Sequence, residues 1–416
     1  MSNRAIAVDE RPPLLKTLPL SLQHLFAMFG STVLVPILFH VNPSTILLFN
    51  GIGTLLYLVL CKGRIPAYLG SSFAFLSPVF LVLSQYSYES ALGGFIAAGI
   101  VFCLVAMLIR AVGTDWIDVI FPPASMGAIV AVIGLELMPT AASMAGLTAK
   151  EPDGTTIFIS ITTLAITVFA SVAFKGFLAI IPILIGVAGG YIVAACNGFV
   201  DWSMVEKAPL FALPTIYTPQ FDLGAILIIL PASIVVIVEH VGHLIVTGNI
   251  VGHDLTRNPG LDRSLLGNGL STILSGCFGS TPNTTYGENI GVLAITKVFS
   301  TWVIGGAAVF AILLSCLGKL AAIIQSIPAP VMGGVSILLF GVIAASGIRI
   351  LVEGKVNYNK PTNLLLTAIV LGVGVSTASI TIGTVTLSGM SLATVVAVFL
   401  GLAFHIISIF RREQEE

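Results

Sequence analysis

The chain has 416 residues, of which 56% are hydrophobic and only 9% are charged, and its formal net charge is −1. Soluble domains carry about 25% charged residues, so this composition indicates an integral membrane protein. A net charge near zero leaves no basic patch to neutralise phosphates, which argues against nucleic acid as a partner. The five cysteines all lie in or beside apolar segments, so we expect no disulfide framework.

Apolar runs of about 20 residues, the length of one membrane crossing, predict fourteen spans in an all-α polytopic membrane protein. The first seven are Leu18–Phe39, Ser44–Cys61, Ile65–Ser84, Ala91–Ile109, Pro122–Leu137, Thr155–Phe174 and Gly176–Phe199. The second seven are Leu223–Gly248, Leu265–Gly279, Thr281–Val298, Thr301–Ile323, Pro328–Ala345, Pro361–Ala378 and Leu387–Phe410.

The positive residues support this count. With the N-terminus in the cytoplasm, all but three of the 18 Lys and Arg residues fall in inner segments, as the positive-inside bias requires. The three exceptions are Lys150, Lys207 and Lys319. Both termini are therefore expected to be cytoplasmic. The first apolar run lacks a small-residue cleavage site, so no removable signal peptide is expected.

Internal matches pair each span with the span seven positions later. The three matched pairs are Leu48–Leu56 with Leu266–Leu274, Pro122–Gly127 with Pro328–Gly333, and Gln23-His24 with Glu239-His240. Because seven is an odd number, the second copy enters the membrane from the opposite side. The sequence thus predicts two inverted seven-span repeats, residues 1–210 and 211–416.

The tenth span contains a polar interruption, Gly279–Gly291, which carries the carboxylate Glu288. Its glycines and Pro282 interrupt a helix, and irregular backbone at membrane depth survives only where protein shields it or where it lines a cavity. The repeat pairs this break with Leu69–Phe75 in the third span, so that Phe73 matches Glu288. We expect two short β-strands that pair with each other, each followed by a half-helix with free N-terminal amides.

A second intramembrane carboxylate, Glu239, lies in the eighth span and is followed by two histidines. Glu239 and His243 are separated by four residues and share one helix face, whereas His240 lies about 100° away and is interpreted as structural. The spacing matches neither His-Glu-x-x-His nor His-x-x-Glu-His, so an intramembrane metallohydrolase is a remote alternative and no metal site is predicted. We do not expect an enzyme.

Two carboxylates without a neighbouring Lys or Arg disfavour an anionic ligand, and free backbone amides oppose a cation. A neutral planar molecule with both donors and acceptors fits best. Its N–H groups would donate to Glu239 and Glu288, and its carbonyls would accept from the amides of Phe73 and Gly287. Aromatic rings are candidates for packing on its faces: Phe73, Tyr286 and Phe340. This description suits a pyrimidine or purine base.

Other polar residues within the spans are assigned weaker roles. Gln23 and His24 are expected to support the backbone at the breaks, and Asn289 to donate across to the third span. Glu136 ends the fifth span, where a functional role and an ordinary interfacial carboxylate both remain open.

The run Glu288–Lys297 resembles the signature of the nucleobase–ascorbate transporter family, in which Gln, Glu or Pro is followed by Asn, any residue, Gly, four more residues, Thr, and Arg, Lys or Gly. Gln23-His24 and the motif Glu239-His-x-Gly-His243 also resemble that family, and the similarity extends over the whole chain.

The resemblance implies a core domain (residues 18–111 and 223–323) that moves against a gate domain (residues 112–200 and 327–411). It also implies proton-coupled uracil uptake in the bacterial inner membrane, no cofactor, and a homodimer formed through the gate domains. Carried over residue by residue, the ligand contacts fall on Glu239, Glu288, Phe73 and Gly287. Close by lie His243, Tyr286 and Ser72. One departure is Phe340, where the best-known relative carries Tyr, so any role of that hydroxyl in coupling is in doubt.

Two carboxylates in one dry cavity repel each other, and burial disfavours their charge, so one is expected to hold a proton. We assign proton uptake to Glu288, the principal ligand contact to Glu239, and a modulating role to His243. Proton symport with alternating access follows from these roles. A xanthine or purine permease of the same family and an anion exchanger of the related sulfate-carrier fold are the remaining alternatives.

Overall fold

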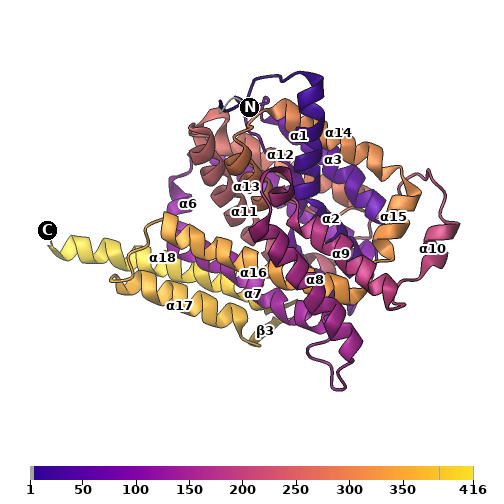
Figure 1. The fold of residues 1–416 in the computed structure, drawn as a ribbon. Helices are drawn as coiled ribbons and strands as arrows, with labels where there is room; N and C mark the ends of the chain where they lie inside the picture. The colour runs from indigo at the N-terminus through magenta and orange to yellow at the C-terminus, as the bar shows by residue number, and fades with distance from the viewer. Residues whose placement is uncertain (1–3, 384, 416) are drawn as a thin grey trace.

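The computed structural model describes residues 4–383 and 385–415, and the chain in these ranges is mostly helical (Figure 1). The helices of the first half are α1 Leu14–Ala27, α2 Phe29–Phe39, α3 Pro43–Leu60, α4 Leu76–Leu83, α5 Tyr88–Val112, α6 Asp115–Ile120, α7 Pro123–Met144, α8 Gly154–Ala173 and α9 Pro182–Cys196. Short 3-10 turns are η1 Phe73–Phe75 and η2 Gly176–Ile180, and a π-turn, η3, covers Thr256–Gly260.

The second half begins after a short helix in the connection, α10 Trp202–Lys207. Its helices are α11 Leu223–Val251, α12 Leu261–Phe278, α13 Gly287–Thr296, α14 Thr301–Ser315, α15 Gly318–Gln325, α16 Ala329–Glu353, α17 Pro361–Val375 and α18 Gly389–Glu415. The strands are β1 Leu69–Ser71, β2 Asn283–Thr285, β3 Ser379–Ile382 and β4 Val385–Ser388.

Within the described residues, eight helices are long and apolar enough to cross a membrane when α1 and α2 are counted together. The others are α3, α5, α7, α8, α11, α16 and α18, and shorter apolar helices occur at Phe73–Leu83, α9, α14 and α17. This distribution is that of a multi-pass membrane protein. In the predicted ninth span, α12 buries Ser264, Asn268, Ser271, Thr272 and Ser275, which explains its lower apolarity.

Helix packing divides the chain into two groups. In one, α3 packs on α14 and α12, α5 packs on α12 and α11, and α1 packs on α14. In the other, α7 packs on α16 and α17, α8 packs on α9 and α16, and α17 packs on α18. Figure 1 shows α1, α3, α12 and α14 of the first group above α7, α16, α17 and α18 of the second.

The contacts of one half recur in the other. The pair α3–α14 corresponds to α12–α5, the pair α8–α9 to α17–α18, and the pair α8–α16 to α17–α7, each obtained by exchanging a span with its predicted repeat partner. Repeat partners also touch each other directly, at α3–α12, α7–α16 and β1–β2. In the α7–α16 contact, a Cβ on Gly134 would overlap the backbone of Phe340 and Ala344, and a Cβ on Gly347 that of Gly127 and Ala131. The helices therefore run antiparallel at backbone contact.

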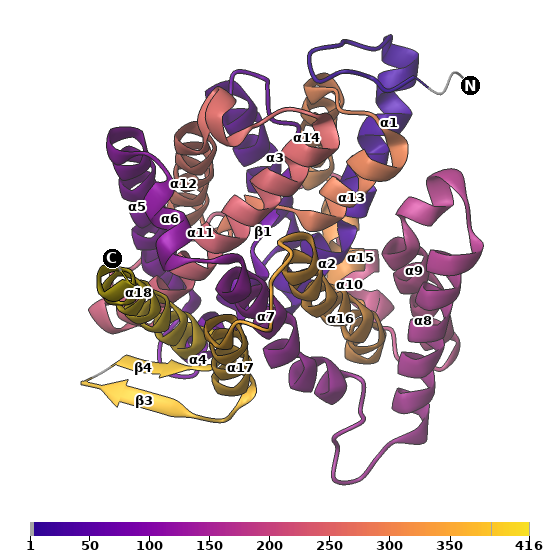
Figure 2. The same ribbon diagram turned by 90° about the vertical axis from the view of Figure 1, so that its left-hand side faces the viewer.

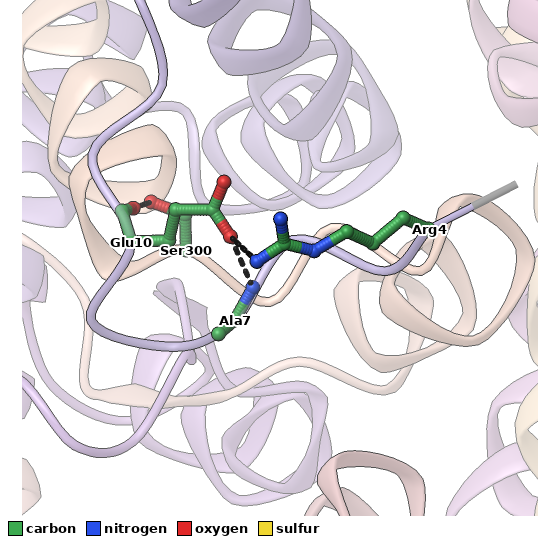
Figure 3. Close-up of polar contacts among 4 residues, drawn as sticks. All are labelled: Arg4, Ala7, Glu10 and Ser300. Carbon is green, nitrogen blue, oxygen red and sulfur yellow. Dashed lines mark hydrogen bonds and ion pairs between the residues drawn. The ribbon is translucent and has the colours of Figure 1, made fainter. Parts of the chain in front are cut away.

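The N-terminal segment closes over the connection that follows α13 (Figure 3). Ile6 pairs with Val298 in a parallel bridge, and Ser300 Oγ donates to the carbonyl of Glu10 at 2.6 Å. The Glu10 carboxylate in turn accepts from the amide of Ala7 and lies 3.7 Å from the guanidinium of Arg4. These contacts brace the linker between α13 and α14.

Element boundaries differ from those of the predicted spans, most clearly in the first span and around the thirteenth and fourteenth. The first span is not one continuous helix, because α1 ends at Ala27 and α2 begins at Phe29. The predicted thirteenth and fourteenth spans, expected to end at Ala378 and begin at Leu387, end and begin instead at Val375 and Gly389. Between them lies an antiparallel hairpin of β3 and β4, which the sequence analysis did not anticipate (Figure 2).

Candidate functional site

Two three-residue strands from the two halves meet in the interior. They pair antiparallel, with Leu69 opposite Thr285, Gly70 opposite Thr284 and Ser71 opposite Asn283. They lie in the two stretches where the sequence analysis placed interruptions. Within the described part of the chain, each strand has only the other as a sheet partner, so side chains satisfy much of the remaining backbone.

The anchors of the strands come from the neighbouring helices α3 and α12. Thr54 Oγ1 on α3 accepts from the amide of Leu69 at 2.9 Å, and Thr272 Oγ1 on α12 accepts from the amide of Asn283 at 3.2 Å. The Asn283 side chain donates to Ser271 Oγ at 2.7 Å and to the carbonyl of Phe49 at 3.3 Å. Polar residues on apolar helices thus hold irregular backbone at membrane depth.

A half-helix follows each strand. Ser72 and Tyr286 stand at the two N-cap positions with extended backbone, and η1 with α4 begins at Phe73 while α13 begins at Gly287. The first amides of a helix have no intrahelical acceptor. Gly287 is exposed, lines a cavity and carries no side chain to cover its amide. Its N–H is therefore available to a ligand.

A cavity of about 260 Å³ lies against these helix starts. Elements β2, α11, α13 and η1 of the first packing group supply Phe73, Glu239, His243, Thr284, Thr285, Tyr286, Gly287, Glu288 and Gly291. Helices α7 and α16 of the second group supply Val130, Val342, Ile343, Ser346 and Arg349. The cavity thus lies between the two packing groups.

Glu239 and Glu288 both line this cavity, one from α11 and the other from the first turn of α13. Glu239 Oε2 is buried and has no hydrogen-bond partner among the described residues. A buried carboxylate oxygen without a partner is costly, so this atom is the strongest candidate for an acceptor that a ligand completes.

His243 and His240 occupy different environments, as their spacing on the helix predicts. His243 lines the cavity, and its Nδ1 lies 3.2 Å from Thr285 Oγ1 on strand β2. His240 is fully buried, and its Nε2 lies 2.8 Å from Ser264 Oγ, which also contacts the hydroxyl of Tyr57. His243 therefore belongs to the site and His240 to the packing of α11 on α3 and α12.

Aromatic rings form one wall. The Phe73 ring lies 5.8 Å from that of Tyr286 and 6.0 Å from that of Phe340, the latter edge to face at 84°. Tyr286 is held by a 2.8 Å hydrogen bond from its hydroxyl to the carbonyl of Ser71. Phe340 is fully buried and stands behind Phe73 rather than among the cavity-lining residues. Ser72 also lies behind the wall, with a buried hydroxyl.

The expected supporting residues join α1 to α13. Asn289 Nδ2 lies 3.2 Å from both the carbonyl and the Nδ1 of His24, and Gln23 is buried beside it in α1. We expected Asn289 to donate toward the third span, but its observed partner is α1. The reason is geometric: α13 packs directly against α1.

Sequence reasoning missed the residues that α7 and α16 contribute, above all Arg349. It counted Arg349 only as an inner-end positive charge, and so expected no cation near the carboxylates. The structure places Arg349 on the cavity lining, with its side chain 64% exposed and its Nε 2.7 Å from Glu353 Oε1. No local pattern marks it, because its position depends on how α16 packs against the other group.

Comparison with known proteins agrees with this arrangement. Residues 15–383 match the model of a permease family, Xan_ur_permease. The chain is 67% identical to the uracil permease of Escherichia coli strain K12, covering 100% of this chain and 97% of that one. It is 63% identical to the uracil permease of Paenibacillus larvae, covering 98% of each.

The fold itself is similar to that of a solved transporter. The transmembrane domain of the cyanobacterium bicarbonate transporter BicA superposes with a TM-score of 0.63 at 15% identity, covering 94% of this chain and 97% of that one. At that identity the likeness concerns the fold alone. From the family match, the close relatives and the membrane-spanning helices together, this chain belongs to the Xan_ur_permease family and is a multi-pass membrane permease, not an enzyme.

Proposed function

We propose that this protein imports uracil by proton symport across the bacterial inner membrane. The observation that carries the proposal is the meeting of Glu239, Glu288 and the Gly287 amide on one small cavity, in a chain 67% identical to a uracil permease. Uracil offers two N–H donors for the carboxylates and carbonyl acceptors for the amide. The ring faces are left for Phe73 and Tyr286.

The size of the cavity favours a single ring. Pockets for drug-sized ligands span about 300–1,000 Å³, whereas this one encloses about 260 Å³. A purine or xanthine would need more room between Phe73 and the α16 residues Val342 and Ile343. A pyrimidine is therefore the preferred substrate class. An anion is opposed by the two carboxylates.

Proton coupling follows from the same two acids. Bringing Glu239 and Glu288 into one partly dehydrated cavity disfavours two simultaneous negative charges, and Glu288 is assigned the proton. Glu239 then accepts from the substrate, while His243 orients that contact from its place beside Thr285. Proton and uracil together leave the site with less net charge, which lowers the cost of moving it past apolar surface.

Movement is assigned to the two packing groups. The group with α1, α3, α5, α11, α12 and α14 is the core domain (residues 18–111 and 223–323), and the group with α7, α8, α9, α16, α17 and α18 is the gate domain (residues 112–200 and 327–411). Fourteen spans in two inverted repeats, cytoplasmic termini and a homodimer through the gate domains complete the proposal. The recurring helix contacts and the pairing of β1 with β2 support the inverted repeat.

The test is uptake of radiolabelled uracil by reconstituted vesicles with an imposed proton gradient. We expect Glu288→Gln to bind uracil but to lose proton-driven accumulation, and Glu239→Gln to lose binding at least tenfold. Unlabelled thymine, cytosine and xanthine serve as competitors. Uptake that xanthine blocks better than uracil would replace the substrate assignment, and proton-driven uptake retained by both variants would remove the assigned roles.

A further inference from the structure

We infer that Glu136 is a positioning residue of the transport cycle, which holds the core domain to the gate domain on the side of the site away from Arg349. Glu136 lies on α7, half-buried. Its Oε1 accepts from Ser77 Oγ on α4 at 2.6 Å, and its Oε2 accepts from the amide of Met390 on α18 at 2.8 Å. One carboxylate therefore joins three helices. This inference rests on the proposed function, because it assigns a step of that transport.

Glu136 and its two hydrogen-bond partners are divided between the core domain and the gate domain. Helix α4 continues directly from β1 and η1, so Ser77 is only four residues from Phe73 of the cavity wall. Glu136 and Met390 both belong to helices of the gate domain. The bond to Met390 thus lies within one body, and the bond from Ser77 crosses between the two.

The backbone next to the Glu136 carboxylate leaves space for it because residue 389 is a glycine. Gly389 adopts φ +52°, and a Cβ at this position would overlap the Glu136 carboxyl group. A glycine is therefore required by both the backbone conformation and the close approach. A carboxylate at membrane depth is costly, and here each of its oxygens has a donor.

The position of Glu136 relative to the cavity indicates on which side of the site its contact with Ser77 lies. Because α7 and α16 run antiparallel, Gly134 lies against Phe340 and Ala344, and Gly127 lies against Gly347 and Leu351. Arg349, exposed at the cavity lining, is therefore near the Gly127 level. Glu136 is about half a helical turn past Gly134, so it lies near the level of Phe340, whose buried ring meets that of Phe73 edge to face.

In this conformation the cavity is therefore accessible at the Arg349 end, and the core and gate domains are held together at the Glu136 end. Opening the opposite side requires α4 to separate from α7, which breaks the Ser77–Glu136 hydrogen bond while the Met390 bond remains in the gate domain. A charge-assisted hydrogen bond across the two bodies biases the equilibrium toward the state described here.

The experiment compares KM for uracil influx and efflux in vesicles of known protein orientation. The apparent KM on one side scales inversely with the fraction of protein facing that side. Ser77→Ala and Glu136→Ala are expected to lower the influx KM and raise the efflux KM, changing their ratio about tenfold, as loss of such a bond predicts. A purely structural defect would instead reduce the maximal rate in both directions.

Three controls define the outcome. Ser84→Ala, at the C-cap of α4, removes a hydroxyl whose acceptor among the described residues is the Leu81 carbonyl of that helix, and it should leave the ratio unchanged. Glu136→Gln can accept from Met390 and donate to Ser77, so it should remain close to wild type. The double variant Ser77→Ala/Glu136→Ala should equal Glu136→Ala, because Glu136→Ala already removes the Ser77–Glu136 hydrogen bond.

An unchanged ratio in Ser77→Ala, additive effects in the double variant, or a Gln variant that behaves like Ala would each overturn the assignment. Wild-type protein that does not take up uracil would contradict the proposed function instead. In that case, hydrogen exchange of residues 76–83 in Ser77→Ala against Ser84→Ala tests the contact without any ligand. Equal protection in the two variants would overturn it.

Discussion

His243 Nδ1 lies 3.2 Å from Thr285 Oγ1, which ties the cavity face of α11 to strand β2. The same imidazole faces Gly287, since a Cβ built on that glycine would lie 3.5 Å from His243 Nε2. His243 thus links strand β2 and the first residue of α13 to the helix that carries Glu239.

Thr285→Val removes this hydroxyl while keeping the side-chain shape. We expect uracil affinity to fall about two- to tenfold, since a neutral hydrogen bond contributes about 0.5–1.5 kcal/mol and here fixes the ring orientation. Equilibrium binding of labelled uracil measures it. Thr163→Val, on α8 and outside the cavity lining, deletes a hydroxyl that donates to the Ile159 carbonyl of its own helix and is the matched control. Equal affinities in both variants would argue against a role for His243 orientation.

Gly53→Ala tests the support beneath the strands. A Cβ on Gly53 would overlap Ser271 Oγ and lie 2.6 Å from Asn283 Nδ2, the group that anchors β2. Overpacking of this kind costs about 1–3 kcal/mol. We therefore expect a lower thermal unfolding temperature and weaker uracil binding.

Gly372→Ala provides the comparison, because nothing lies within 4 Å of a Cβ at that helical position. Replacing an unobstructed helical glycine should be neutral or stabilising by up to about 1 kcal/mol. If Gly53→Ala matched Gly372→Ala in stability and binding, the close packing of α3 on α12 would not position the site.

Arg349→Gln tests whether the cation at the cavity lining contacts the ligand. Its pair with Glu353 is exposed, and such pairs contribute about 0–1 kcal/mol, so unfolding should be unaffected. Since the proposed ligand is neutral, we expect its affinity to change by less than about threefold. Isothermal titration with uracil decides this, and a loss greater than about tenfold would place Arg349 in direct contact with the substrate.

Asp153 offers a pH test outside the membrane spans. It caps α8, and hydrogen bonds from the Thr156 hydroxyl and amide and from the Thr155 amide lower the pKa of its carboxyl below 3.8. A lowered native pKa means that this stabilisation is complete above the unfolded pKa and is lost as the pH falls through the native one.

Asp153→Ala should therefore lower the unfolding temperature at neutral pH, with the difference shrinking as the pH drops below 3.8. Asp153→Asn keeps a capping oxygen, so its unfolding temperature at neutral pH should lie between those of the wild type and Asp153→Ala. A difference between wild type and Ala that did not depend on pH would contradict the ionic part of the cap.

The features that could be predicted from sequence are those set by local periodicity and by the repeat. Spacing of four residues places Glu239 and His243 on one face, and the span offset locates the second break once the first is seen. The β3–β4 hairpin escaped prediction because it falls almost entirely between two predicted spans, where short stretches of alternating hydroxyl and apolar side chains form no apolar run. The position of Arg349 at the cavity and the partner of Asn289 could not be predicted, because both depend on how helices from distant segments pack together.

The pairing of β1 with β2 has a consequence for how such a molecule could arise. Each three-residue strand has backbone groups that pair with the other strand, which in the proposed inverted repeat belongs to the oppositely oriented copy. In the proposed inverted repeat, one seven-helix unit expressed alone would bury an open strand edge in lipid, and only the unit of residues 211–416 would carry Glu239 and Glu288. On this proposal, a working carrier requires two copies of the unit inserted in opposite membrane orientations.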